Sequence, residues 1–200
     1  MNAIILSAQD RLSSVEIGAA LDAFCQRMDV IDAQCGQNFP LFSPGVSSVW
    51  TVSQGGSWIG GFWGACWWLR SHLQGSHSDQ KKASLLCMRL GSKINLDSVN
   101  RSMLFWYGAA LGAQLTNDMQ ARETAHQAAF ALFTSFDERM QCIPTGAALG
   151  GGVNGARHIS IDALASIITL LRFDDRKPVQ DVAQKHTQTV VNACLKSDGA

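Results

Sequence analysis

The stretch Trp58-Ile-Gly-Gly-Phe-Trp-Gly-Ala-Cys-Trp-Trp-Leu69 decides the fold of this chain. Its paired glycines disfavour a helix at the start, because glycine loses the most backbone entropy on becoming helical. Its second half predicts a helix with bulky apolar side chains on nearly every face. Since such a helix has to be buried all round, we expect a loop ending at Trp58 to run straight into a deeply buried helix.

Trp58 is the tryptophan of this stretch that we expect to be exposed. An indole beside a rigid helix start suits stacking on the face of a sugar ring. The alternative is that all the tryptophans fill the core, and burial preferences favour that role for Trp67 and Trp68.

Length and composition place limits on the class of protein. The 200 residues suit one domain, or part of a larger one, and can bury a sizeable core. The 16 basic and 16 acidic residues cancel, which argues against nucleic acid and anionic membranes as partners. Only 16% of the residues are charged, so much of the surface is expected to be buried or in interfaces.

Targeting and redox signals predict a cytoplasmic, reduced protein. The six cysteines form no CxxC pair, and Cys66 and Cys87 lie within helical patterns as small apolar residues. The first ten residues have no basic segment and too short an apolar run for a signal peptide. Apolar runs of about 18 residues are absent from the sequence, so no membrane span is predicted.

Hydrophobic periodicity predicts an all-α protein. The expected helices cover residues 14–34, 61–74, 79–93, 102–115, 119–138, 161–173 and 178–195. Residues 36–61 are rich in Gly, Ser and Pro and are expected to form a long ordered loop. Ser78 and Ser160 are expected N-caps, and Pro178 is expected at a helix start.

The helices after residue 60 alternate in character. A very apolar helix is followed each time by a more amphipathic one, which predicts an inner and an outer layer, as in an α/α toroid. We divide the chain into an N-terminal helix, residues 1–35, and a toroid domain, residues 36–200. An open toroid edge would expose apolar helices, so self-association is expected.

Two familiar motifs do not fit their context. Gly150-Gly-Gly-Val-Asn-Gly155 matches a dinucleotide-binding pattern, but no strand is predicted before it. The histidines are scattered, and His72 and His77 have the wrong spacing for one helix face. Neither a metal nor an organic cofactor is predicted.

Asp162 is the carboxylate of most interest, because it lies at the start of a strongly apolar helix. It could simply be an acidic residue favoured by the helix dipole. If it faces inward beside the glycine-rich loop, we expect partial desolvation and a raised pKa, which suit general acid/base chemistry.

A series of motifs resembles the unsaturated glucuronyl hydrolase family, glycoside hydrolase family 88, over about residues 50–200. They are Trp58-x-x-Gly61-Phe62-Trp63-Gly64, Leu115-Thr-Asn-Asp118, Ile161-Asp162, Ala183-x-x-His186-x-x-Thr189 and Asp198-Gly199, in this order. The resemblance implies an (α/α)6 barrel, of which about seven of twelve helices would be present.

The resemblance also implies a reaction. A terminal 4,5-unsaturated uronic acid on a small oligosaccharide would be hydrated at its C4=C5 bond and then released, a route different from that of ordinary glycosidases. Asp162 falls on the acid/base position. Trp58, Trp63 and Arg101 are the expected substrate-binding residues.

The sequence departs from the family at four places, one of them near Gly146, where the family usually has a tryptophan. Ser102 stands where the family has a second catalytic Asp, and Asp97 is too far along the chain to replace it. Ser166 stands where an Asn usually follows the catalytic Asp. The family also continues well beyond the position of Gly199.

Three hypotheses therefore remain. The first is a hydrolase of the unsaturated uronyl type, represented by part of the barrel. The second is a catalytically inactive relative that binds carbohydrate or protein. The third is a helical repeat protein whose groove binds a partner. Asp162, Trp58 and Trp63 favour the first hypothesis, whereas Ser102 favours the second.

Overall fold

The computed structural model describes residues 12–195, whose regular secondary structure is helical apart from one small hairpin. The α-helices are α1 (Ser14–Cys35), α2 (Gly60–Gln74), α3 (His77–Leu90), α4 (Arg101–Phe105), α5 (Leu111–Thr116), α6 (Met119–Phe133), α7 (Leu164–Leu171) and α8 (Lys177–Cys194). Strands β1 (Phe39–Phe42) and β2 (Thr51–Ser53) pair antiparallel. The all-α prediction is confirmed, and Asp198-Gly199 and the first eleven residues lie outside the described range.

Helices α4 and α5 belong to one continuous helical segment. A π-helical turn, Trp106–Ala110, joins them without a break in the chain. With this segment counted once, the described residues contain the seven long helices that the sequence predicts. Such turns lie within α-helices and often mark functional sites.

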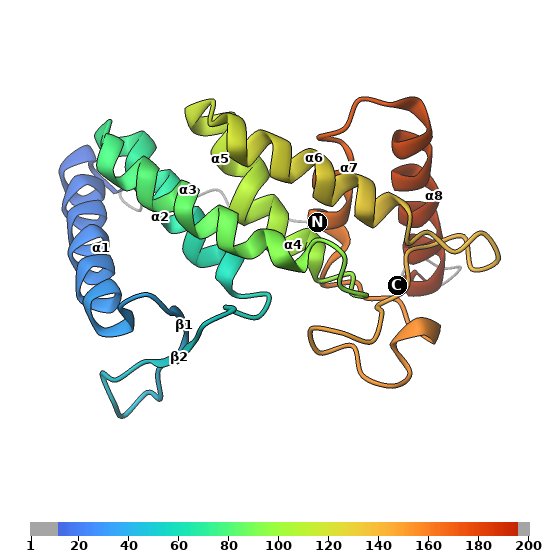
Figure 1. The fold of residues 1–200 in the computed structure, drawn as a ribbon, viewed down its shortest axis with the longest axis horizontal. Helices are drawn as coiled ribbons and strands as arrows, with labels where there is room; N and C mark the ends of the chain where they lie inside the picture. The colour runs from blue at the N-terminus through green and yellow to red at the C-terminus, as the bar shows by residue number, and fades with distance from the viewer. Residues whose placement is uncertain (1–11, 196–200) are drawn as a thin grey trace.

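The helices form two layers, as their alternating character predicts. The inner segment α4–α5 contacts both other inner helices, α2 and α7, and the outer helices α3, α6 and α8 follow the inner ones one by one. Figure 1 shows α1 and α8 at opposite edges of the molecule, with the hairpin and the glycine-rich loop on the same side of the helices. This arrangement buries the apolar inner helices behind the half-polar outer ones.

Local signals explain most helix boundaries, but two predicted caps are wrong. Ser76, not Ser78, caps α3, because its side chain accepts a hydrogen bond from the amide of Asp79. Helix α7 begins only at Leu164, so Ser160 is too far away to cap it. Pro178 lies at the start of α8 as predicted.

The long loop expected before α2 contains the hairpin. Its register pairs Phe39 with Ser53 and Pro40 with Val52, with an irregularity after Pro40. The strands are only four and three residues long, too short to produce an alternating pattern that stands out from a loop.

Helix α1 is buried over only part of its length. Of the apolar residues at helical spacing along α1, Met28 and Ile31 are buried, whereas Leu21 and Phe24 are 40% and 45% exposed. Within residues 12–195, no helix is long and apolar enough to cross a membrane.

Candidate functional site

The inner helices α2 and α4–α5 run parallel and in close contact. A Cβ atom on Gly61 would lie 2.4 Å from the carbonyl oxygen of Leu104, and one on Gly112 would lie 2.2 Å from the indole of Trp68. From the first contact to the second, the residue number rises from Gly61 to Trp68 in α2 and from Leu104 to Gly112 in the other segment. The two helices therefore run parallel. Their N-terminal ends therefore lie at the same end of the molecule.

Ser102 and Ser166 extend this alignment to α7. Their hydroxyl oxygens are 2.8 Å apart, and both side chains are buried. The Ser166 hydroxyl also donates to the carbonyl oxygen of Ala163. Since both serines lie in the first turn of their helices, the structure brings the positions of Trp58, Ser102 and Asp162 to one end of the inner layer.

A partly exposed aromatic cluster begins at Trp58. The Trp58 ring meets Phe62 edge-on at a centroid distance of 5.9 Å, and Phe62 lies 4.4 Å from Tyr107. All three residues are half-buried, so their rings remain partly accessible. Sequence reasoning missed Tyr107, although its place in an aromatic run before two small residues was a usable signal.

Trp63 does not belong to this accessible cluster. It is only 7% exposed and packs edge-on against Trp67 at 5.9 Å. Trp67 and Trp68 are also buried, as predicted. The structure therefore corrects the expected substrate contact of Trp63, because this side chain lies on the buried side of α2.

Lys93 supports the loop that presents Trp58. Its ammonium group donates to the carbonyl oxygen of Ser57 at 3.1 Å, and burial lowers the pKa of this amine. Gly56 and Ser57 both adopt positive φ angles, of 73° and 49°. Lys93 follows α3 in a short 3-10 turn, Gly91–Lys93, where no local pattern in the sequence predicts this contact.

Arg101 has a structural role, which corrects its assignment as a substrate contact. The side chain is buried, and its guanidinium donates to the carbonyl oxygens of Ser98, Ile94 and Ala131 and to the Ser135 hydroxyl. Burial lowers the pKa of this arginine, while Asp97 partly opposes that effect. These contacts fasten the start of α4 to α6 and leave the guanidinium inaccessible to a sugar.

Asp162 is exposed, contrary to the expected desolvation. The reason is the position of the helix start. Helix α7 begins at Leu164, so Asp162 lies in the preceding turn and not on the buried face of the helix. Its carboxylate is therefore accessible to a ligand at this end of the inner layer.

Asp97 binds the glycine-rich loop. Its carboxylate accepts from the amide of Ala147 at 3.0 Å, and its carbonyl oxygen accepts from the amide of Ala148 at 2.7 Å. Gly146 has a φ of 76°, and a Cβ atom there would lie 2.5 Å from the Asp97 carbonyl oxygen. The loop then enters a 3-10 turn, Gly155–Arg157, rather than the α-helix that a dinucleotide motif requires.

Within residues 12–195, no three His, Cys, Asp or Glu side chains are grouped so that they could hold a metal ion. The groups available at the candidate site are therefore the exposed carboxylate of Asp162, the aromatic cluster at Trp58 and the two buried hydroxyls of Ser102 and Ser166. A carboxylate can transfer a proton, and aromatic rings can hold a sugar.

Solved structures show which fold this is. The chain is similar to unsaturated glucuronyl hydrolases from Streptococcus agalactiae (TM-score 0.81, 21% identity, 94% of this chain and 49% of that chain) and Bacillus sp. GL1 (TM-score 0.77, 22% identity, 90% and 49%). It is also similar to an unsaturated glucuronyl hydrolase specific for heparin (TM-score 0.69, 15% identity, 90% and 50%). No protein-family model and no curated protein sequence matches the chain.

These likenesses define the class as helical toroids. More particularly, the fold is that of the unsaturated glucuronyl hydrolases, which confirms the resemblance at the level of fold. The chain spans about half the length of the solved structures that it matches.

Proposed function

We propose that this chain is a glycoside hydrolase of the unsaturated uronyl type, acting on a small oligosaccharide. The observation that supports this most directly is the accessible carboxylate of Asp162 at the same end of the toroid as the aromatic cluster of Trp58. The fold shared with unsaturated glucuronyl hydrolases adds to it. Each feature alone is common, but an accessible acid and a sugar platform at one end of a toroid suit this reaction.

In the proposed reaction, the Asp162 carboxyl group donates a proton to C4 of the unsaturated ring. Water adds at C5 and returns a proton to the carboxylate, so the acid is regenerated. The resulting hemiketal opens and releases the rest of the oligosaccharide. Because Asp162 is exposed in the free chain, the sugar bound on Trp58 would itself have to exclude water from the carboxylate.

The test follows the near-ultraviolet absorbance of the conjugated enol ether in unsaturated chondroitin, heparin and pectin disaccharides. We expect the absorbance to fall with at least one of them. Asp162→Asn should slow that decay by about 10²- to 10⁴-fold, the usual contribution of a general acid. Asp175→Asn is the matched control, since it neutralises an exposed carboxylate beyond the other end of α7. Full activity of Asp162→Asn would refute the assigned acid.

The second candidate is a carbohydrate-binding relative without catalysis. The specific observation in its favour is that Ser102 and Ser166 satisfy each other at two positions where the resemblance implies a carboxylate and an amide. Saccharide binding without any decay of absorbance would support this candidate over the first.

Ser102→Asp then tests the reason for inactivity. If the missing carboxylate is the cause, Ser102→Asp should produce absorbance decay, provided that its thermal unfolding remains cooperative. Ser102→Ala serves as the control, because it removes the hydroxyl contact without adding a carboxylate.

A further inference from the structure

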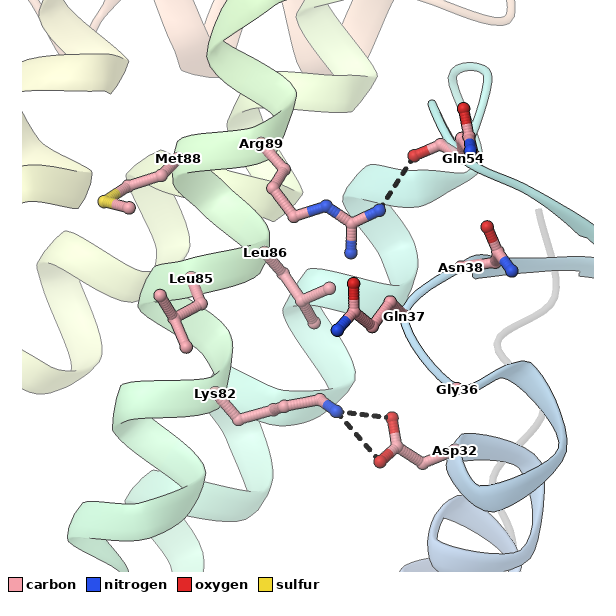
Figure 2. Close-up of a pocket in the computed structure, with 10 residues that line it drawn as sticks. All are labelled: Asp32, Gly36, Gln37, Asn38, Gln54, Lys82, Leu85, Leu86, Met88 and Arg89. Carbon is pink, nitrogen blue, oxygen red and sulfur yellow. Dashed lines mark hydrogen bonds and ion pairs between the residues drawn. The ribbon is translucent and has the colours of Figure 1, made fainter.

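A groove of about 520 Å³ lies between α3, the C-terminal end of α1 and the start of the β1–β2 hairpin. Its lining includes Gln37, Asn38, Leu86 and Arg89, none of which belongs to the candidate site described above. Figure 2 shows Arg89 and Leu86 leaving α3 toward the segment that carries Gln37 and Asn38. The volume is in the range of small-molecule sites, about 300–1,000 Å³.

Arg89 is held in one orientation on the wall of this groove. Its guanidinium lies over the ring of Phe39, with its central carbon 4.6 Å from the ring centroid. It donates through Nη2 to the backbone carbonyl oxygen of Gln54 at 2.9 Å. A guanidinium has five N–H donors, so a planar fork remains for an acceptor in the groove.

The opposite wall carries side-chain amides on a rigid turn. Gly36 has a φ of 57°, and its backbone amide donates to the carbonyl oxygen of Asp32. The backbone amide of Asn38 donates to the carbonyl oxygen of Cys35. This fixes the backbone that bears Gln37 and Asn38. In Figure 2 neither side-chain amide is hydrogen-bonded to another residue of the groove, and that of Gln37 points toward α3.

Among the residues that line the groove, Arg89 is the cation whose charge is not paired with a carboxylate. Lys82 forms an ion pair with Asp32 at 2.9 Å, and the two cancel. Arg89 makes no ion pair with any carboxylate between residues 12 and 195. Leu86 also lines the groove but is only 3% exposed, so the contacts that the groove offers here are mainly polar.

We propose that this groove binds a carboxylate-bearing sugar, a hexuronate residue, with Arg89 on the carboxylate and the amides of Gln37 and Asn38 on hydroxyl groups. A planar guanidinium matches a carboxylate in bidentate geometry. An amide both donates and accepts, as a sugar hydroxyl does. This site is non-catalytic and independent of the reaction proposed above, because it uses none of the same residues.

The experiment is an NMR titration of the folded chain with D-glucuronate, D-glucose, acetate and sulfate. We expect glucuronate to shift the side-chain amide signals of Gln37 and Asn38 and the Nε–H signal of Arg89. We also expect it to bind about tenfold more tightly than glucose or acetate, since each of these offers only half of the contacts. Weaker binding of sulfate than of glucuronate would distinguish a uronate site from a general anion site.

Variants assign the contacts. Arg89→Gln should weaken glucuronate binding about five- to tenfold and leave glucose binding unchanged, whereas Asn38→Ala should weaken both. Lys81→Gln removes an exposed charge from the same helix outside the groove and should change neither. The proposal is overturned if sulfate binds as tightly as glucuronate, if Arg89→Gln has no effect, or if glucuronate shifts no signal in this groove.

Discussion

At the scale of single residues, His186 fits the core only as a neutral imidazole. Its Nδ1 accepts a hydrogen bond from the amide of Ile143 at 3.1 Å, so the proton of the neutral ring is on Nε2. Nε2 is buried and has no partner in the described part of the chain. Burial therefore lowers the pKa of His186 from 6.5 to about 4.

This shift predicts a pH-dependent stability. Between about pH 4 and pH 6.5 the unfolded chain binds a proton that the folded chain does not, so stability is full above this window and falls as the pH drops through it. The loss is on the order of 3 kcal/mol. His186→Asn keeps an acceptor for Ile143 and should flatten this part of the pH profile in urea unfolding. His158→Asn, at an exposed histidine, should leave the profile unchanged.

Ser102 shows how far residue types alone can predict a site. The sequence identifies two departures from the family pattern, at Ser102 and Ser166, but it does not reveal that their hydroxyls bond to each other. That contact depends on how α4 and α7 pack. The same limit explains Arg101, because the acceptors that bury its guanidinium come from α6 and from loop carbonyls.

At the scale of elements, close packing of α2 on α4 depends on a missing side chain. Gly61 approaches the backbone of Leu104 so closely that a Cβ atom would lie 2.4 Å from its carbonyl oxygen. Backbone atoms cannot move aside as a flexible side chain can. The paired glycines of the opening stretch both lie within α2, contrary to the expectation that they disfavour a helix there, and Gly61 permits the contact of the two helices.

We expect Gly61→Ala to destabilise the fold by about 1–3 kcal/mol, because the added methyl group separates α2 from α4. Gly18→Ala is the matched control. Nothing lies within 4 Å of a Cβ at Gly18, so this change in α1 should be neutral or stabilising by up to about 1 kcal/mol. Chemical denaturation measures both, and equal stability of the two variants would contradict the packing argument.

Helices were more predictable than their contacts and ends. The apolar period of α2 and the Pro at the start of α8 are local signals, and the structure follows them. The short strands β1 and β2 and the late start of α7 depend on neighbours that are distant in sequence. Asp162 is exposed for that reason, since its predicted burial assumed a helix that begins three residues earlier.

At the scale of the whole molecule, the edge at α1 leaves apolar surface uncovered. Val15, Ile17, Leu21 and Phe24 are all at least 40% exposed, although their spacing is that of a buried stripe. The solved structures that the chain matches are about twice its length. This edge is therefore where we expect the chain to associate with itself.

Sedimentation velocity over a range of concentrations checks this expectation. We expect wild type to form larger species as concentration rises, and Leu21→Gln with Phe24→Gln to reduce them, because both side chains are exposed and apolar. Val46→Gln removes a fully exposed apolar side chain from the hairpin loop and should leave association unchanged. A monomer at every concentration would argue against this edge as an interface.

The shared direction of α2, α4–α5 and α7 also has an electrostatic consequence. Each helix places a partial positive charge of about half a unit at its N-terminal end, and parallel helices place these charges side by side. The chain carries no formal net charge, so its side chains provide no overall attraction for an acid. The outer helices α3 and α6 run the opposite way, since Leu90 at the end of α3 meets Gly60 and Ala131 near the end of α6 accepts from Arg101. Their C-terminal ends therefore lie at the same end of the molecule and offset the partial charges of the inner helices.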